Sequence, residues 1–150
     1  MSLEKDINQP HFRNEHQKSV INLIFTYNWI TEKTKPFFDK AEITSQQFNI
    51  LRILRGAGKP ISTLQIRQRM LDKMSDTSRI VDRLVVKGLV KKVVCKEDKR
   101  LVDVSITDKG KKLLEKIDKY EPEMDALISS LSESEAKTLN TLLDKLRNSN

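Results

Sequence analysis

The chain has 150 residues, of which 33% are charged and 37% hydrophobic, a balance typical of a helix-rich globular protein with its own core. Its longest apolar runs are only a few residues, which excludes a bilayer-spanning helix, and its polar N-terminus argues against a secretory signal. Cys95 is the single cysteine, so a disulfide framework and a multi-thiolate metal site are excluded. We therefore expect a cytoplasmic protein with no membrane partner.

The net charge is +7, and the excess is concentrated in the middle of the chain. Residues 60–112 carry fourteen Lys/Arg against seven Asp/Glu, whereas residues 113–150 carry five against eight. A concentrated basic segment suits a polyanion, because phosphate contacts release counterions and dominate affinity. The alternative is a solvated surface that only keeps the protein in solution, and charge alone does not separate the two.

Capping signals mark where four helices begin. Thr44, Ser62 and Ser132 each stand three residues before a Gln or Glu, which is the spacing of a capping box. Ser75 marks a fourth start, and Gly88 is the stop of that helix. We predict helices over about 45–56, 63–70, 76–87 and 133–147. The helix at 76–87 is expected to bury Ile80, Val81, Leu84 and Val85. The helix at 133–147 is expected to bury Ala136, Leu139, Leu142, Leu143 and Leu146.

The remaining helices are predicted near the two ends of the chain. The first spans about 12–35, ends at Pro36, and is apolar on two sides, so it needs two packing partners, one of them a candidate second chain. Apolar residues follow a heptad-like spacing over 113–131, and Pro122 should kink or break that helix.

Between these helices the pattern is that of strands. Val102, Val104 and Ile106 alternate with polar residues, and a charged turn at 96–100 separates them from Val93 and Val94. Two short strands around such a turn predict a β-hairpin. The expected fold class is therefore mainly α with a small β-hairpin wing: a winged helix-turn-helix lobe plus terminal dimerisation helices.

In such a lobe the helices at 63–70 and 76–87 form the helix-turn-helix. Its second helix, 76–87, enters the major groove of DNA, whose width matches a helix. The side chains expected to be exposed on 76–87 are polar, and Arg79 lies near the N-terminus, where a bidentate contact to guanine is possible. Arg83 and Lys87 lie further along and are better suited to phosphates. The alternative is an ordinary amphipathic surface helix of mixed charge. The side chains concerned are Asp76, Thr77, Ser78, Arg79, Asp82, Arg83 and Lys87.

Three segments resemble the multiple-antibiotic-resistance regulator (MarR) family. SRIVDRLVVKGLV at 78–90 is similar to its recognition helix, EDKRLVDVSITDKG at 97–110 to its wing, and ITSQQF at 43–48 to the start of its second helix. The resemblance covers nearly the full length and implies one MarR-like domain. The boundaries it implies are 1–150 for the domain, 40–110 for the DNA-binding lobe, and 10–36 and 111–150 for dimerisation helices.

The resemblance also implies roles for individual residues. Ser78 and Arg79 would face bases, and Arg100 would enter the minor groove. Asp98 would hold Arg100 in place by a salt bridge. The DNA-binding set expected in full is Ser75, Thr77, Ser78, Arg79, Arg83, Lys87, Lys96, Asp98, Lys99 and Arg100.

Many members of that family bind small aromatic or phenolic ligands between the dimer helices and the DNA-binding lobe. The resemblance therefore implies a small aromatic effector, and the aromatic side chains on the helices concerned are the candidates to line its cavity. Plain core packing is the alternative for them. They are Phe25, Trp29, Phe48 and Tyr120.

The function expected is that of a sequence-specific regulator of transcription that binds double-stranded DNA, as a homodimeric repressor on a pseudo-palindromic operator. The alternatives are a winged-helix protein-interaction module and a non-specific architectural DNA binder. No catalytic set can be assembled, and His11 and His16 lie five residues apart rather than the three or four that bring a metal pair to one helical face. We expect no enzymatic activity, no cofactor and no metal.

Overall fold

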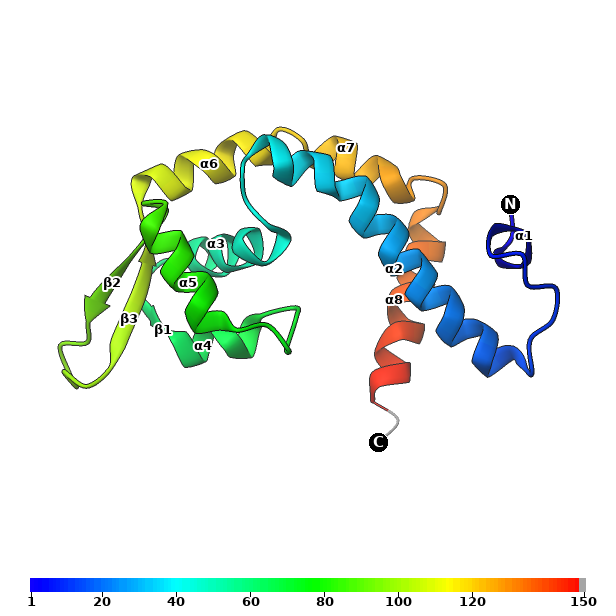
Figure 1. Ribbon diagram of the computed structural model, residues 1–150, viewed down its shortest axis with the longest axis horizontal. Helices are drawn as coiled ribbons and strands as arrows, with labels where there is room; N and C mark the ends of the chain where they lie inside the picture. The colour runs from blue at the N-terminus through cyan, green and yellow to red at the C-terminus, as the bar shows by residue number, and fades with distance from the viewer. Residues whose placement is uncertain (149–150) are drawn as a thin grey trace. The chain divides into compact units, whose positions relative to one another are not determined.

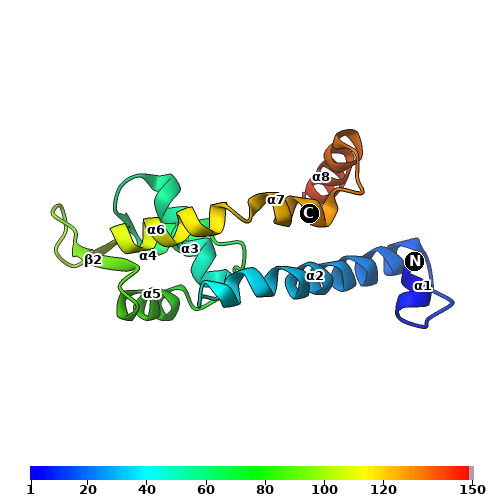
Figure 2. The same ribbon diagram turned by 90° about the horizontal axis from the view of Figure 1, so that it is seen from above.

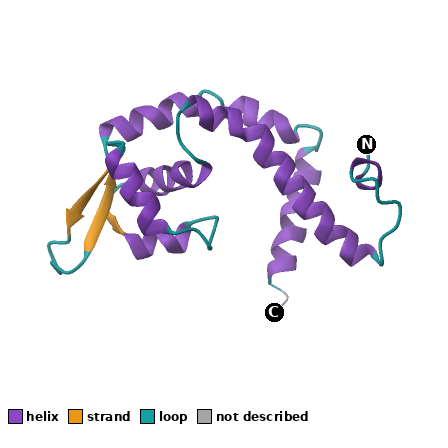
Figure 3. Ribbon diagram, viewed as in Figure 1, coloured by secondary structure: helices purple, strands orange, loops and turns teal. Residues whose placement is uncertain are grey.

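A computed structural model describes residues 1–148 (Figures 1 and 3). The chain divides into two compact units, Met1–Pro36 and the part from Phe37 onward. Within the described residues, no helix is both long enough and apolar enough to cross a membrane. In chain order the elements are α1 (Leu3–Asp6), α2 (Glu15–Lys40), α3 (Ser45–Ala57), β1 (Ile61–Ser62), α4 (Thr63–Arg69), α5 (Thr77–Val86), β2 (Val90–Val94), β3 (Val102–Ile106), α6 (Asp108–Asp118), α7 (Glu121–Asp125), the 3-10 helix η1 (Ala126–Ile128) and α8 (Glu133–Arg147).

The N-terminal unit holds a short helix, α1, that the sequence did not predict. Leu3 of α1 is only 6% exposed, and Glu4 forms an ion pair with Lys18 of α2. The hydrogen bond from the Lys18 ammonium lowers the pKa of the Glu4 carboxyl to about 2. α2 itself buries no side chain completely, so its two predicted apolar sides lie open or half-open in a single chain.

The prediction that the first helix ends at Pro36 is wrong, because α2 continues through that residue to Lys40. Proline lacks the N–H that would bond one turn back, so the continuation needs a compensating interaction. The two phenylalanines directly after Pro36 pack against aromatic side chains of the second unit. The Phe37 ring lies 5.8 Å from the ring of Tyr120, and the Phe38 ring 5.0 Å from that of Phe48.

The second unit is built around a winged helix-turn-helix lobe, visible in Figure 2 as the cluster of α3, α4, α5 and the strands. The predicted capping boxes of Thr44 and Ser62 are both present at the starts of α3 and α4. The apolar faces of these helices meet the inner face of the sheet in one core. Its fully buried members include Ile50, Leu51, Leu54, Ile61, Ile66, Val81, Leu84, Val104 and Leu114.

The predicted hairpin is confirmed, and it belongs to a three-stranded antiparallel sheet of order β1-β3-β2. β2 and β3 pair from Val90 opposite Ile106 to Val94 opposite Val102. β1 adds two residues on the other side of β3, with Ile61 opposite Val104. The fold is thus mainly helical with a small three-stranded wing sheet.

The start of α5 differs from the prediction by one residue. Asp76, not Ser75, is the N-cap, and its carboxylate accepts a hydrogen bond of 3.2 Å from the Arg79 amide. Val85, which was expected to be buried, is 37% exposed, because the apolar face of α5 is centred on Val81 and Leu84 instead.

One junction joins the end of α5, the end of β3 and the start of α6. Gly88 has φ +72°, which confirms it as the stop after α5. The Thr107 hydroxyl donates to the Gly88 carbonyl at 2.7 Å and accepts from the Gly110 amide at 3.1 Å. A Cβ added at Gly110 would lie 2.3 Å from the Leu89 carbonyl oxygen, so only glycine allows this close approach.

The C-terminal helices follow the predicted break. α6 ends at Asp118 and α7 begins at Glu121, directly before Pro122. A bidentate pair between Arg55 and Asp118, at 2.7 and 3.1 Å, joins α3 to α6 and lowers the pKa of the Asp118 carboxyl. Ile117, one of the apolar residues in the heptad-like spacing over 113–131, is buried in the lobe's own core.

α8 begins at the predicted capping box of Ser132. Its predicted apolar face is correct in position, but no residue of it is buried in a single chain. Leu142, for example, is 57% exposed. The expected burial is therefore absent from the described chain, because no other described element covers this face. The other positions concerned are Ala136, Leu139, Leu143 and Leu146.

Candidate nucleic-acid interface

α5 presents a polar face away from the lobe core. Ser78, Arg79 and Arg83 are exposed on it, while Val81 and Leu84 anchor the opposite face. Within residues 1–148 neither arginine has an ion-pair partner. Their guanidinium groups are thus available to acceptors outside the chain, and a guanidinium fork suits both guanine edges and phosphates.

Thr77 was expected on this exposed face, and that expectation is wrong. It is only 4% exposed, and its hydroxyl is buried with no hydrogen-bond partner in the described chain. The cause is its place on the helix: Thr77 stands four residues before Val81 and seven before Leu84, so it shares the buried face of α5 with them. The Thr77 side chain therefore does not lie on the exposed face of α5.

The turn between α4 and α5 is held by side chains on both sides. The Asp72 carboxylate accepts from the Met74 amide at 3.0 Å, and the Ser75 hydroxyl donates to the Asp72 carbonyl at 2.7 Å. Asn49 of α3 accepts from the Leu71 amide at 2.9 Å. Asn49 and Asp72 support this turn, and the sequence did not point to them, although an Asp two residues before the amide that it binds is a recognisable local turn signal.

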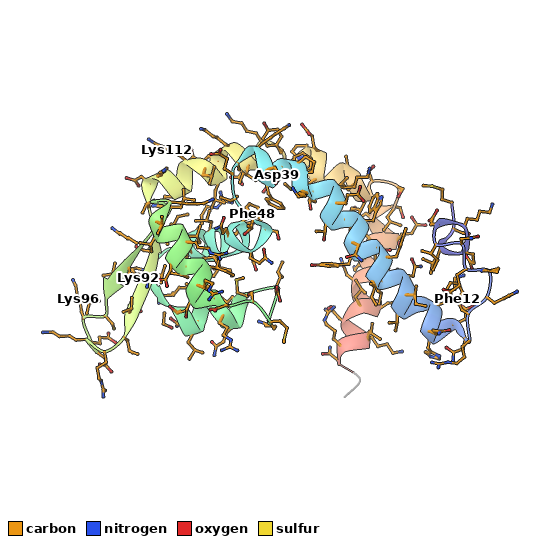
Figure 4. The ribbon with its side chains drawn as sticks, viewed as in Figure 1. Phe12, Asp39, Phe48, Lys92, Lys96 and Lys112 are labelled. Carbon is orange, nitrogen blue, oxygen red and sulfur yellow. The ribbon has the colours of Figure 1, made fainter. Side chains whose placement is uncertain are left out.

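The wing tip carries the predicted Asp98–Arg100 salt bridge. Arg100 donates from Nε to one Asp98 oxygen at 3.0 Å and from a terminal nitrogen to the other at 3.1 Å, and its backbone amide donates to the same carboxylate at 3.0 Å. These bonds lower the pKa of the Asp98 carboxyl. The Arg100 side chain is nevertheless 89% exposed. Lys96 and Lys99 are exposed beside it, and Lys96 projects from the hairpin end (Figure 4).

Two lysines near α5 are engaged within the lobe. The Lys87 ammonium donates to the carbonyl of Glu42, and Lys92 of β2 pairs with Asp82 of α5. Lys87 was predicted to contact phosphates, and the structure directs its ammonium to the loop before α3 instead. Its phosphate contact stays a prediction, and it requires the Lys87 ammonium to leave the Glu42 carbonyl for a phosphate oxygen.

The four predicted effector-binding aromatics lie in separate surroundings. Phe25 and Trp29 line one open hollow of the N-terminal unit, together with Leu3 and Asp6 of α1. In the second unit, Phe48 and Tyr120 each contact a phenylalanine of α2 and a cation: Arg52 lies 5.7 Å from the Phe48 ring centroid and Lys40 lies 5.3 Å from that of Tyr120.

Metal-ligating side chains do not gather in the part of the chain that the structure describes: no group of three or more His, Cys, Asp or Glu is suited to hold an ion there. The polar groups of the lobe instead form an exposed, basic surface of helix and hairpin tip. That geometry suits recognition of a polyanion.

Comparison with known proteins agrees with this geometry. The MarR family model matches residues 42–101. The HTH-type transcriptional regulator PecS of Dickeya dadantii is 31% identical over 113 residues, which are 73% of this chain and 68% of PecS.

Two solved structures extend the similarity to the fold. A MarR variant from E. coli complexed with operator DNA is 26% identical with a TM-score of 0.70, over 85% of this chain and 95% of that one. NadR in complex with 4-hydroxyphenylacetate is 26% identical with a TM-score of 0.69, over 93% of this chain and 99% of that one. Matched helices, wing and sequence segments lead to one family, which is a family of regulators and not of enzymes. The chain belongs to the MarR family of winged helix-turn-helix, DNA-binding transcription regulators.

Proposed function

We propose that this regulator is a cytoplasmic, homodimeric repressor that reads a pseudo-palindromic operator. In this proposal α5 of each chain enters the major groove and the wing tip enters the adjacent minor groove. Ser78 and Arg79 contact bases, Arg83 contacts phosphates, and Arg100 lies in the minor groove. Lys96 and Lys99 add positive charge at the wing tip.

The observation that carries the proposal is the fixed but exposed guanidinium of Arg100. A free arginine loses much of its rotamer freedom when it docks, and the two hydrogen bonds to Asp98 remove part of that freedom beforehand. A surface that attracted phosphates by charge alone would gain nothing from a carboxylate at the hairpin tip. The Asp98 carboxylate therefore favours specific insertion into a narrow groove over general attraction.

Exposed apolar residues support the homodimer. α8 leaves Leu139, Leu142 and Leu146 open to solvent, and α2 leaves Val20, Ile24 and Tyr27 open in the N-terminal unit. Apolar surface of this kind marks an interaction site. A two-fold dimer presents two copies of α5, which matches a site made of two half-sites.

A small aromatic ligand is the proposed effector that relieves repression. The similarity to NadR, whose structure contains 4-hydroxyphenylacetate, supports an aromatic ligand. Phe25 and Trp29 in the N-terminal unit and Phe48 and Tyr120 in the second unit are the proposed aromatic contacts.

The experiment is a fluorescence-anisotropy titration of the full chain against a selected operator duplex and a scrambled duplex of equal length, at several salt concentrations. A repressor of this kind shows a large ratio between the two affinities. An architectural binder shows equal affinities with a steep salt dependence, and a protein-interaction module binds neither duplex. Either of the last two results overturns the proposal.

Two variants refine the same titration. Arg79→Ala is expected to cost about 1–3 kcal/mol on the operator and to relax selection at one base pair in each half-site. Lys137→Ala on α8 removes an equal charge far along the chain from the proposed interface and serves as the control. If both variants lose the same affinity on both duplexes, Arg79 does not read bases.

A further inference from the structure

The outer face of the wing sheet forms the floor of a hollow of about 720 Å³, within the size range of small-molecule sites. We call it the sheet hollow. β2 and the end of β3 supply this floor, and the walls are the end of α3, the turn between α3 and β1, and the first turn of α6. All of these belong to the second unit.

Strand register explains which side chains enter the sheet hollow. Lys91 of β2 lies opposite Ser105 of β3, so both point to the same face of the sheet. Their neighbours Lys92 and Val104 also form a pair and point to the other face, where Lys92 reaches Asp82 of α5. The sheet hollow and α5 thus lie on opposite faces of the sheet.

Ser105 contributes an unusual polar group to this floor. Its hydroxyl oxygen is buried, and residues 1–148 supply no hydrogen-bond partner for it. A buried hydroxyl without a partner costs free energy, so such groups in native proteins call for a specific explanation. A ligand with acceptor oxygens would provide the missing hydrogen bond once the neighbouring atoms that cover the hydroxyl move aside.

The charge of the sheet hollow defines what kind of ligand fits. Arg55 is committed to Asp118. Lys59, Lys91 and Lys111 line the hollow and have no ion-pair partner in the described chain. The only carboxylate among the lining residues is that of Asp108, which leaves an excess of two positive charges. A phosphate monoester carries about −1.5 to −2 at neutral pH and has three acceptor oxygens, so it matches both the charge and the hydroxyl.

We propose that the sheet hollow binds the phosphoryl group of a small phosphorylated molecule. Lys59, Lys91 and Lys111 surround the phosphoryl oxygens, Ser105 donates a hydrogen bond to one of them, and the organic part lies against Pro60 and other apolar wall residues. Lysine suits this role because its ammonium is a compact point charge with three donors. The site is separate from the proposed operator contacts.

The test is isothermal calorimetry of the full chain without DNA, at constant ionic strength, with phenyl phosphate, inorganic phosphate and benzoate as probes. Phenyl phosphate is expected to bind more tightly than inorganic phosphate, because its ring covers apolar wall, and much more tightly than benzoate, which carries one charge. Equal binding of phenyl phosphate and benzoate would overturn the proposal. Because no DNA is present, this result does not depend on operator recognition.

Matched variants locate the binding. Ser105→Ala removes only a hydroxyl that lacks a partner, so the fold should persist while affinity for phenyl phosphate falls about tenfold. Lys111→Gln should also weaken binding, whereas Lys112→Gln removes the same charge from the next residue, which lies outside the hollow. Equal losses of phenyl phosphate affinity in Lys111→Gln and Lys112→Gln would mean that general surface charge causes the binding, and they would refute the site.

A second titration separates a small-molecule site from a DNA phosphate contact. Ser105→Ala should leave affinity for a mixed-sequence DNA duplex unchanged. A tenfold loss for the duplex would show that the sheet hollow contacts the DNA backbone, and it would overturn the assignment to a small phosphorylated molecule.

Discussion

Gly110→Ala tests the junction that joins α5, β3 and α6. The added methyl would lie 2.3 Å from the Leu89 carbonyl oxygen and 2.7 Å from Cγ1 of Ile106. The Leu89 oxygen cannot easily move away, because it accepts a hydrogen bond from the Thr107 amide at 3.1 Å. The substitution therefore forces backbone, and not only a flexible side chain, to shift.

The size of the effect follows from two opposing terms. Inserting a methyl into a packed site costs typically 1–3 kcal/mol, and the rigid carbonyl puts this case at about 3 kcal/mol. Alanine recovers up to about 1 kcal/mol through its better helix propensity. The net prediction is a loss of about 2 kcal/mol in the free energy of unfolding.

Urea denaturation followed by circular dichroism, at one fixed protein concentration, measures this loss. Gly56→Ala is the matched control, since Gly56 lies in α3 with nothing within 4 Å of an added Cβ. It should stabilise the protein by about 0.5–1 kcal/mol. If Gly110→Ala is as stable as the wild type, or if the two variants shift in the same direction, the close approach at Gly110 does not constrain the fold.

Three further predictions concern single groups. Asp98→Ala should weaken operator binding on the order of fivefold by freeing Arg100. Glu97→Ala removes the same charge from the same turn and should leave binding unchanged or tighten it. Tighter binding by both variants in anisotropy titrations would mean that charge alone matters. Thr77→Val should leave operator affinity unchanged and maintain or raise the urea midpoint, because it removes a buried hydroxyl without a partner. A loss of operator affinity at unchanged stability would indicate that Thr77 contacts DNA. The pKa of the Glu4 carboxyl is about 2 when folded and 4.5 ordinarily, so its stabilising effect on the α1 contact is complete above pH 4.5 and lost as pH falls toward 2. Carboxyl NMR titration should detect this low pKa. If the Glu4 carboxyl still titrates near 2 in a variant that lacks the Lys18 ammonium, the stated cause is wrong.

The capping boxes were predictable because each depends on residues three apart. Thr44, Ser62 and Ser132 carry their partners within one helical turn, so no tertiary information is needed. The salt bridge of the wing tip is equally local, spanning two residues. The family resemblance implies this salt bridge, and the structure confirms its geometry.

Features that depend on distant partners were not predictable in the same way. β1 has only two residues, too few for any periodicity, and exists through pairing with β3 about forty residues later. Ser75 and Asp76 are both good helix caps, and the choice between them follows from which side of α5 the core covers. The contact of the Lys87 ammonium with Glu42 crosses 45 residues, so nothing in the local sequence marks it.

The junction after α5 also acts as a mechanical coupling. Thr107 bonds to Gly88 and Leu89, and the Lys109 ammonium donates to the Lys87 carbonyl at 2.9 Å, so the three residues directly after α5 are fastened to the start of α6. Such short links transmit displacement with little slack, because each bond must break before the two ends can part. A rotation of α6 therefore turns the carboxyl end of α5 with it, and because Leu114 of α6 and Leu84 of α5 share one core, the two helices move as neighbours in the same packing unit.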